Sequence, residues 1–275
     1  MWIYELPAPP PKMVLNFALA NDMPWQGTVT TTAPVLDPYN TAYVNDAEVK
    51  LYEDGIYLAT IDSYQGVEGS YFSEEHLPQS GKRYSIEVTI NEFGTATASY
   101  VQPAVVTPTS FGYRIIGPSS VWPGAEDVEF AIEFNDPEGL DFYEILMVAR
   151  DENGSTLIFN LESPDPSYTD SDIKFAENSG FILDDKLFDG KTARLVFHGM
   201  QLMSGPSGES LKWKSYVVEI KHFSPEYYDY LISFIHQMNA RNDPYAQPVK
   251  IMSNVKNGLG VFAGFTRSVT EYEIN

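Results

Sequence analysis

Short runs of alternating apolar and polar residues, each closed by a turn sequence, dominate this chain of 275 residues. In the clearest case residues 47–53 alternate, Asp54-Gly55 follows, and residues 56–61 form the returning run. A period of two places the apolar side chains of a strand on one face, and Asp-Gly is typical of tight hairpin turns. Residues 83–90 and 128–134 alternate in the same way. The pattern predicts a mostly β protein.

The strand runs fall into two groups, which predict two domains after a proline-rich start. Residues 1–12 are rich in proline and are expected to form an extended tether. Residues 13–106 contain several short strand runs and predict an N-terminal immunoglobulin-like or prealbumin-like β-sandwich. The periodicity breaks at residues 103–112, so residues 107–275 are expected to form a second β-rich domain.

One segment of the second domain has the period of an α-helix, which we expect at about residues 225–239. Ser224 can cap its first turn, and Pro225 suits the first helical position, where no N–H is needed. Apolar side chains then recur at three- and four-residue spacings: Tyr227, Tyr228, Leu231, Phe234, Ile235 and Met238. We expect this amphipathic helix to pack across the sheet of the second domain.

Charge and composition exclude several classes of protein. The chain has 38 acidic and 17 basic residues, which gives a net charge of −21. Such a surface repels phosphate groups, so no binding to nucleic acid is expected, whereas cations, basic peptides and neutral glycans are compatible partners. The same charge also suits a protein that needs only to stay soluble. The absence of cysteine excludes thiolate chemistry, and no apolar run approaches the ~18 residues of a membrane helix.

The sequence contains no recognisable catalytic motif, and we expect that the protein is not an enzyme. Each of its four histidines stands apart from other motif residues: His76, His198, His222 and His236. Neighbouring carboxylates such as Asp136, Glu138 and Asp141 leave a hydrolase as an alternative, because glycoside hydrolysis uses two carboxyl groups across a cleft. The same residues suit a turn, which Pro137 and Gly139 indicate.

Calcium is the one ion that the sequence suggests. Asp184, Asp185 and Asp189 belong to an acidic stretch and supply the carboxylate oxygens that calcium prefers. The stretch lacks the spacing of an EF-hand loop, so a solvated acidic loop is the alternative. No other cofactor is expected.

Two tryptophans are candidates for contact with a ligand. Trp25 and Trp122 each neighbour a proline in sequence typical of loops. A tryptophan on a loop can bind a glycan or a peptide through its ring, and the alternative is that it packs over the loop beneath it.

Several segments along the chain are distinctive in combination. They are Pro11-Lys12-Met13-Val14-Leu15-Asn16, residues 47–55, Pro78-x-x-Gly81-Lys82-x-Tyr84, Tyr227-Tyr228-x-Tyr230-Leu231, residues 242–249 and residues 253–264. Together they resemble a family of cell-envelope lipoproteins of the Bacteroidetes, which is described only as a domain of unknown function. The resemblance covers essentially the whole chain.

The resemblance implies export, a lipid on an N-terminal cysteine and anchoring in the outer membrane. This chain departs from that pattern because it has no cysteine, so we expect the signal segment and the lipid-bearing cysteine to have been removed. Genes of the family commonly lie near those of TonB-dependent transporters. The resemblance therefore implies a non-catalytic accessory or substrate-capturing partner of such a β-barrel, with a structural or adhesive envelope protein, stabilised by calcium, as the alternative.

Overall fold

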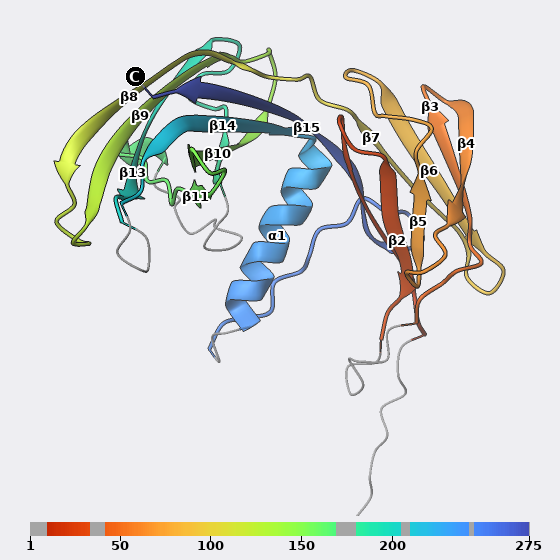
Figure 1. Ribbon diagram of the computed structural model, residues 1–275. Coiled ribbons are helices and arrows are strands. Elements are labelled where there is room, and N and C mark those ends of the chain that lie inside the picture. The colour runs from red at the N-terminus through yellow and green to blue at the C-terminus, as the bar shows by residue number, and fades with distance from the viewer. Residues whose placement is uncertain (1–9, 34–41, 169–179, 205–209, 242–244, 275) are drawn as a thin grey trace, which may run out of the picture.

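Two β-sandwich lobes, joined by one long strand, form an arch in the computed structural model (Figure 1). The structure describes residues 10–33, 42–168, 180–204, 210–241 and 245–274. Most of these residues lie in strands, so the prediction of a mostly β protein in two lobes is confirmed. Residues 1–9 of the predicted tether and residues 242–244, which belong to the family resemblance, lie outside the described residues.

The N-terminal lobe is a sandwich in which two groups of strands cover one core. Its strands are β1 (Met13–Ala20), β2 (Trp25–Thr31), β3 (Glu48–Glu53), β4 (Ile56–Ser63), β5 (Ser70–Ser73), β6 (Arg83–Ile90) and β7 (Gly94–Val101). They follow the hydrogen-bonded order β1-β2-β5-β4-β3-β6-β7. The predicted hairpin turn joins β3 to β4, with Asp54 at φ 49° and Gly55 at φ 81°. Both angles are those of a type I′ turn, which Asp-Gly favours.

The C-terminal lobe is a second sandwich with its own aromatic core. Its smaller sheet has the order β13 (Thr192–Leu202), β9 (Ala125–Asn135), β8 (Pro108–Pro118). The facing sheet contains β11 (Thr156–Ile158), β10 (Phe142–Asp151), β12 (Phe181–Asp184) and β14 (Trp213–Phe223), and a short 3-10 helix spans Pro166–Tyr168. Alternate residues of the central strands point inward, as their sequence pattern requires, and Phe130 and Phe134 of β9 are fully buried.

Strand β15 (Leu259–Glu273) belongs to both lobes. Its first half pairs in parallel with β1 over residues 259–265, and its second half pairs antiparallel with β14 over residues 265–273. Val255 and Phe262 are buried in the core of the N-terminal lobe. A boundary near residue 106 therefore leaves out a part of that core, because the end of the chain returns to complete the first sandwich.

The segment that connects the lobes is fixed to β14 and β15 by side chains. Gln102 donates from Nε2 to the carbonyl of Phe265 at 2.8 Å, and the Thr266 hydroxyl donates to the carbonyl of Ala104 at 2.7 Å. His222 of β14 contacts the same Ala104 carbonyl through Nδ1 at 2.9 Å. Hydrogen bonds from side chains to backbone carbonyls therefore attach the connecting segment to β14 and β15.

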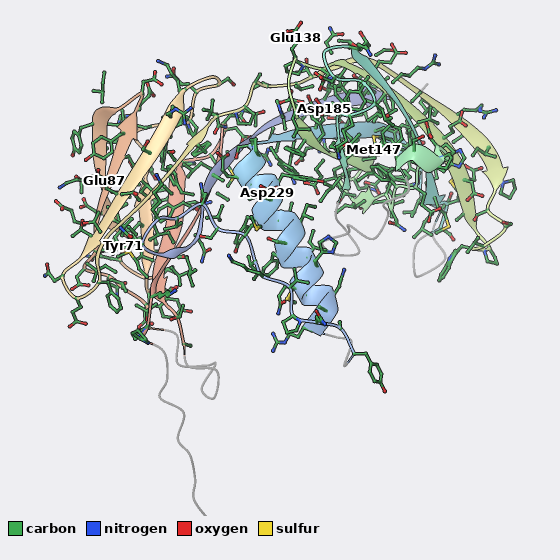
Figure 2. All side chains as sticks on the ribbon, turned by 180° about the vertical axis from the view of Figure 1, so that it is seen from behind. Tyr71, Glu87, Glu138, Met147, Asp185 and Asp229 are labelled. Atoms are coloured by element: carbon green, nitrogen blue, oxygen red, sulfur yellow. The ribbon has the colours of Figure 1, made fainter. Side chains whose placement is uncertain are left out.

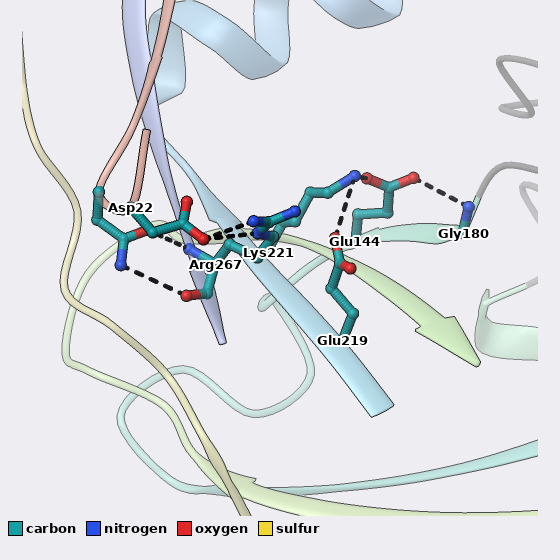
Figure 3. A network of polar contacts seen from close by, with 7 residues as sticks. Asp22, Glu144, Gly180, Glu219, Lys221 and Arg267 are labelled. Carbon is teal, nitrogen blue, oxygen red and sulfur yellow. Dashed lines mark hydrogen bonds and ion pairs between the residues drawn. The ribbon is translucent and has the colours of Figure 1, made fainter. Parts of the chain in front are cut away.

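A polar network spans the joint (Figure 3). The Arg267 guanidinium of β15 binds Asp22 in the β1–β2 turn at 2.5 Å, and the Arg267 backbone exchanges hydrogen bonds with the Asn21 amide. Beside it, the Lys221 ammonium binds Glu144 at 2.7 Å. The network connects a turn of the first lobe to strands of the second.

The helix α1 (Pro225–Arg241) confirms the predicted segment and continues for two residues beyond it. Ser224 Oγ accepts the Tyr227 N–H at 3.3 Å, as expected of a cap. The ring of Tyr228 stacks on Phe142 with centroids 3.9 Å apart. The helix packs on the sheet of the second lobe, as expected, because Ile235 shares an apolar cluster with Phe142, Ile182 and Phe223 of that sheet. It then runs out on the concave side of the arch (Figure 1).

Candidate ligand groove and acidic cluster

The connection between β8 and β9 lies at the end of the C-terminal lobe that is remote from the joint (Figure 1), and side chains there line an apolar groove. The connection between β8 and β9 carries Trp122 and Val121 into solvent, where their side chains are 58% and 81% exposed. The groove holds about 640 Å³ and is lined mainly by apolar side chains, which are Ile116, Val121, Trp122, Leu157, Ile158, Met200 and Leu202. So many exposed apolar groups in one place are unusual for a surface that binds nothing.

The polar residues that line the groove include two carboxylates. Asp127, Glu162 and His198 line it together with Ser119 and Asn160. His198 Nε2 lies 3.4 Å from a carboxylate oxygen of Glu129, so this imidazole is engaged with an acid of the neighbouring strand β9. The rim therefore accepts hydrogen bonds and favours positive groups.

Only one of the two predicted ligand-binding tryptophans is accessible. Trp122 lies in a loop at the groove, as expected. The interpretation of Trp25 as a loop residue is wrong, because it is the first residue of β2 and is fully buried. Its ring meets Tyr84 edge-on at 5.0 Å in the N-terminal core, so a ligand at the surface cannot reach it.

Three aspartates converge at the opposite end of the same lobe, near the joint. Asp136 follows β9, and Asp185 and Asp189 lie in the turn that follows β12. One carboxylate oxygen from each residue lies within 4.8 Å of the others. Asp136 and Asp185 are buried, whereas Asp189 is exposed. Figure 2 shows Asp185 within the lobe and Glu138, in the neighbouring turn, at its outer surface.

Asp136 holds the two turns together through hydrogen bonds. Its Oδ1 accepts the Tyr143 hydroxyl at 2.5 Å, and its Oδ2 accepts the Gly190 N–H at 2.8 Å. Asp189 links the same two turns in the other direction, because its Oδ1 accepts the Gly139 N–H at 2.9 Å. Burial raises the pKa of Asp136, and the nearby charge of Asp141 adds to this, while the bonds from Tyr143 and Gly190 oppose it.

Asp185 is the anomaly of the cluster. It is 1% exposed, and neither of its carboxylate oxygens has a hydrogen-bond partner. Burial raises the pKa of Asp185, as do the charges of Asp136 and Asp141. The backbone amides of Asp141 and Asp185 lie close enough to lower that pKa in part, but neither has the geometry of a hydrogen bond to the carboxylate. A buried carboxylate without partners costs several kcal/mol or so unless something neutralises it.

The predicted calcium ligands are brought together only in part. Asp185 and Asp189 meet, but Asp184 points away and binds Lys186 Nζ at 2.5 Å. The third member of the cluster, Asp136, is predicted from its sequence as a turn residue, and it lies directly after β9. Nothing in the local sequence links residues 136 and 185, because β10, β11 and β12 separate them along the chain.

The expectation that each histidine stands apart is wrong for His222 as well as for His198. The His222 ring is buried, with Nε2 at 2.6 Å from Asp141 Oδ1 and Nδ1 at 2.9 Å from the Ala104 carbonyl. Through these two contacts the His222 ring connects Asp141, beside the acidic cluster, to the segment that joins the lobes.

Comparison with protein families identifies the chain. The family described as "Domain of unknown function (DUF4249)" matches residues 3–271. The chain belongs to this family. The predicted resemblance to a domain of unknown function is thus confirmed, whereas the envelope location and the transporter stay predictions. No curated protein matches the chain. Among the described residues, no helix combines the length and the apolar character needed to cross a membrane.

Proposed function

We propose that this member of the family is a non-catalytic cell-envelope protein that captures a peptide in the Trp122 groove for a TonB-dependent outer-membrane transporter. The observation that carries the proposal is the groove itself. Its indole and aliphatic walls are open to solvent, and the neighbouring strands β8, β9 and β13 form one three-stranded sheet beneath them. A rigid scaffold that presents exposed apolar side chains in a concave surface is typical of binding sites.

The chemistry of the groove favours a peptide with apolar and basic side chains. Aliphatic walls such as Ile116, Ile158 and Met200 match apolar side chains better than the hydroxyl-covered rings of a glycan. The rim carboxylates Asp127 and Glu162 attract positive groups, and the net charge of −21 repels anionic ligands. Trp122 supplies a flat ring on which a lysine or arginine side chain can lie.

Burial of the remaining polar clusters supports a non-catalytic role. Asp136 and Asp185 are two neighbouring carboxylates with raised pKa values, but both lie inside the lobe, where a glycosidic bond cannot approach them. His222 is buried between two acceptors that hold both ring nitrogens. A general base needs access to the proton that it removes.

The envelope location is supported by the family resemblance of the sequence. Proteins of this kind are exported and anchored in the outer membrane through an N-terminal lipid, and their genes commonly neighbour those of TonB-dependent transporters. A captured peptide is a cargo that such a barrel imports. We place this protein on the outer membrane as a lipid-anchored partner of the barrel, which would receive the peptide from the groove.

Calorimetric titration tests the ligand. The probes are three oligomers: alternating Leu-Lys, alternating Leu-Glu and a neutral maltooligosaccharide. We expect the Leu-Lys peptide to bind and the Leu-Glu peptide not to bind, with the affinity falling about tenfold or more in Trp122→Ala, because the exposed ring forms one wall. Tyr57→Ala, at an equally exposed aromatic of the other lobe, is the matched control. Binding of the oligosaccharide alone would replace the peptide by a glycan.

Cross-linking in native outer membranes tests the partner. The full-length lipidated protein is captured after cross-linking, and bound proteins are identified by mass spectrometry. We expect a TonB-dependent barrel as the dominant partner. Recovery of the protein alone, under conditions in which known neighbours cross-link efficiently, would refute the transporter partnership and favour a structural or adhesive role.

A further inference from the structure

The acidic cluster near the joint combines two features that a solvated acidic loop lacks. Asp185 is buried with both carboxylate oxygens unpartnered. Two further carboxylates lie close by, and no lysine or arginine among the described residues forms an ion pair with any of the three. Negative charge concentrated in this way inside a protein is normally neutralised by protons or by a bound cation.

The donor set identifies the class of cation. All three groups are carboxylates, which are hard ligands, and no thiolate is available because the chain has no cysteine. Calcium binds six to eight oxygens at about 2.3–2.6 Å, so oxygens on opposite sides of the ion are about 4.6–5.2 Å apart. Oxygens that all lie within 4.8 Å of one another fit around one such ion.

The two turns that carry the carboxylates are already fixed in place. The Gly190 N–H binds Asp136, the Gly139 N–H binds Asp189, and the Asp185 N–H donates to the carbonyl of Asp141 at 3.1 Å. These bonds leave both oxygens of Asp185 available, and the exposed Asp189 gives an ion a route from solvent to the buried pair. The arrangement is therefore preorganised, which lowers the entropic cost of binding.

We propose that Asp136, Asp185 and Asp189 bind one calcium ion, with water completing its coordination. The ion links the turn before β10 to the turn after β12. Through Asp141, His222 and the Ala104 carbonyl, the same two turns are connected to the segment that joins the lobes. Calcium binding is expected to stabilise this end of the C-terminal lobe and to leave the remote Trp122 groove unchanged, so it is independent of the proposed ligand.

Metal-binding assays on the intact chain test the site. After treatment with a chelator, we expect calorimetric titration with calcium to give one site per chain, and terbium to bind in its place with luminescence excited through Tyr143, whose hydroxyl bonds Asp136. Asp185→Asn should weaken calcium binding about tenfold or more, because it removes the unpartnered carboxylate. Asp184→Asn is the matched control, since this neighbouring carboxylate binds Lys186 outside the cluster.

Thermal denaturation supplies a second readout. Calcium should raise the Tm of the wild type and of Asp184→Asn, and should have little effect on Asp185→Asn. If Asp185→Asn does not fold, Asp189→Asn serves instead, because this residue is exposed and its amide oxygen can still accept the Gly139 N–H. Absence of saturable calcium binding at millimolar concentration, or equal affinity in the wild type and the aspartate-to-asparagine variants of the cluster, would overturn the site.

Discussion

Replacing Phe262 by alanine tests whether the two lobes unfold as one body. Phe262 is contributed by β15, yet its ring is fully buried in the N-terminal core. It meets Tyr100 edge-on at 5.1 Å and lies 6.4 Å from both Phe17 and Trp25, measured between ring centroids. The substitution leaves a cavity between β15 and the rest of the first sandwich.

The size of the effect follows from the burial of the ring. Truncation of a fully buried phenylalanine to alanine costs about 3–5 kcal/mol of unfolding free energy. For a chain of this size each kcal/mol lowers the Tm by about 2–4 °C, so the expected decrease is roughly 6–20 °C. Because β15 pairs with β1 and with β14 in one continuous sheet, we expect the C-terminal lobe to lose its stability together with the N-terminal one.

Scanning calorimetry combined with hydrogen exchange measures this outcome. We expect a single transition, with exchange in β6 of the first lobe and β9 of the second accelerating together in Phe262→Ala. Ile56→Ala is the control, because Ile56 lies in the same lobe and is 74% exposed. Two separate transitions, of which only the N-terminal one moves, would contradict the argument that the shared strand couples the lobes.

Two further predictions concern backbone space and pH. Gly260→Ala should destabilise the protein more than Gly55→Ala, as measured by the urea midpoints of unfolding. Both glycines have positive φ, but a Cβ at residue 260 would lie 2.0 Å from the Leu15 carbonyl oxygen, whereas residue 55 has open space around it. Burial raises the pKa of Asp136 and Asp185 in the folded state. In calcium-free buffer, the contribution of these two groups to stability is therefore fully present below their unfolded pKa of about 3.9 and is lost as the pH rises through their folded pKa values. Asp185→Asn should therefore lose less stability than the wild type between about pH 4 and pH 7, and equal losses would refute this assignment.

The strands and the helix were accessible from the sequence because their signals are local. Alternation over residues 83–90 and 128–134, and the turn at Asp54-Gly55, fix the strand positions without knowledge of the fold. The pairing of β1 with β15 was not accessible, because a parallel contact between Val14 and Leu259 leaves no trace in either segment. The proline before Trp25 suggested a loop, yet tertiary packing places the ring in the core.

The candidate sites show the same division between local and distant signals. Trp122 next to Pro123 indicated an exposed aromatic, and its position on the β8–β9 turn agrees. The acidic run after β12 indicated Asp185 and Asp189, but composition could not show that the side chain of Asp184 turns toward Lys186. Asp136 joins the cluster only because β9 and β12 end at the same side of the lobe, which is a property of the topology.

The strand that both lobes share has a consequence for the order in which the protein can mature. The first sandwich needs residues 259–264, so its core stays incomplete until nearly the whole described chain has been synthesised. A contact between residues separated by about 245 positions also carries a large loop-closure entropy, which slows folding. The core of the N-terminal sandwich is therefore expected to be completed only after the C-terminal strand β15 has been made.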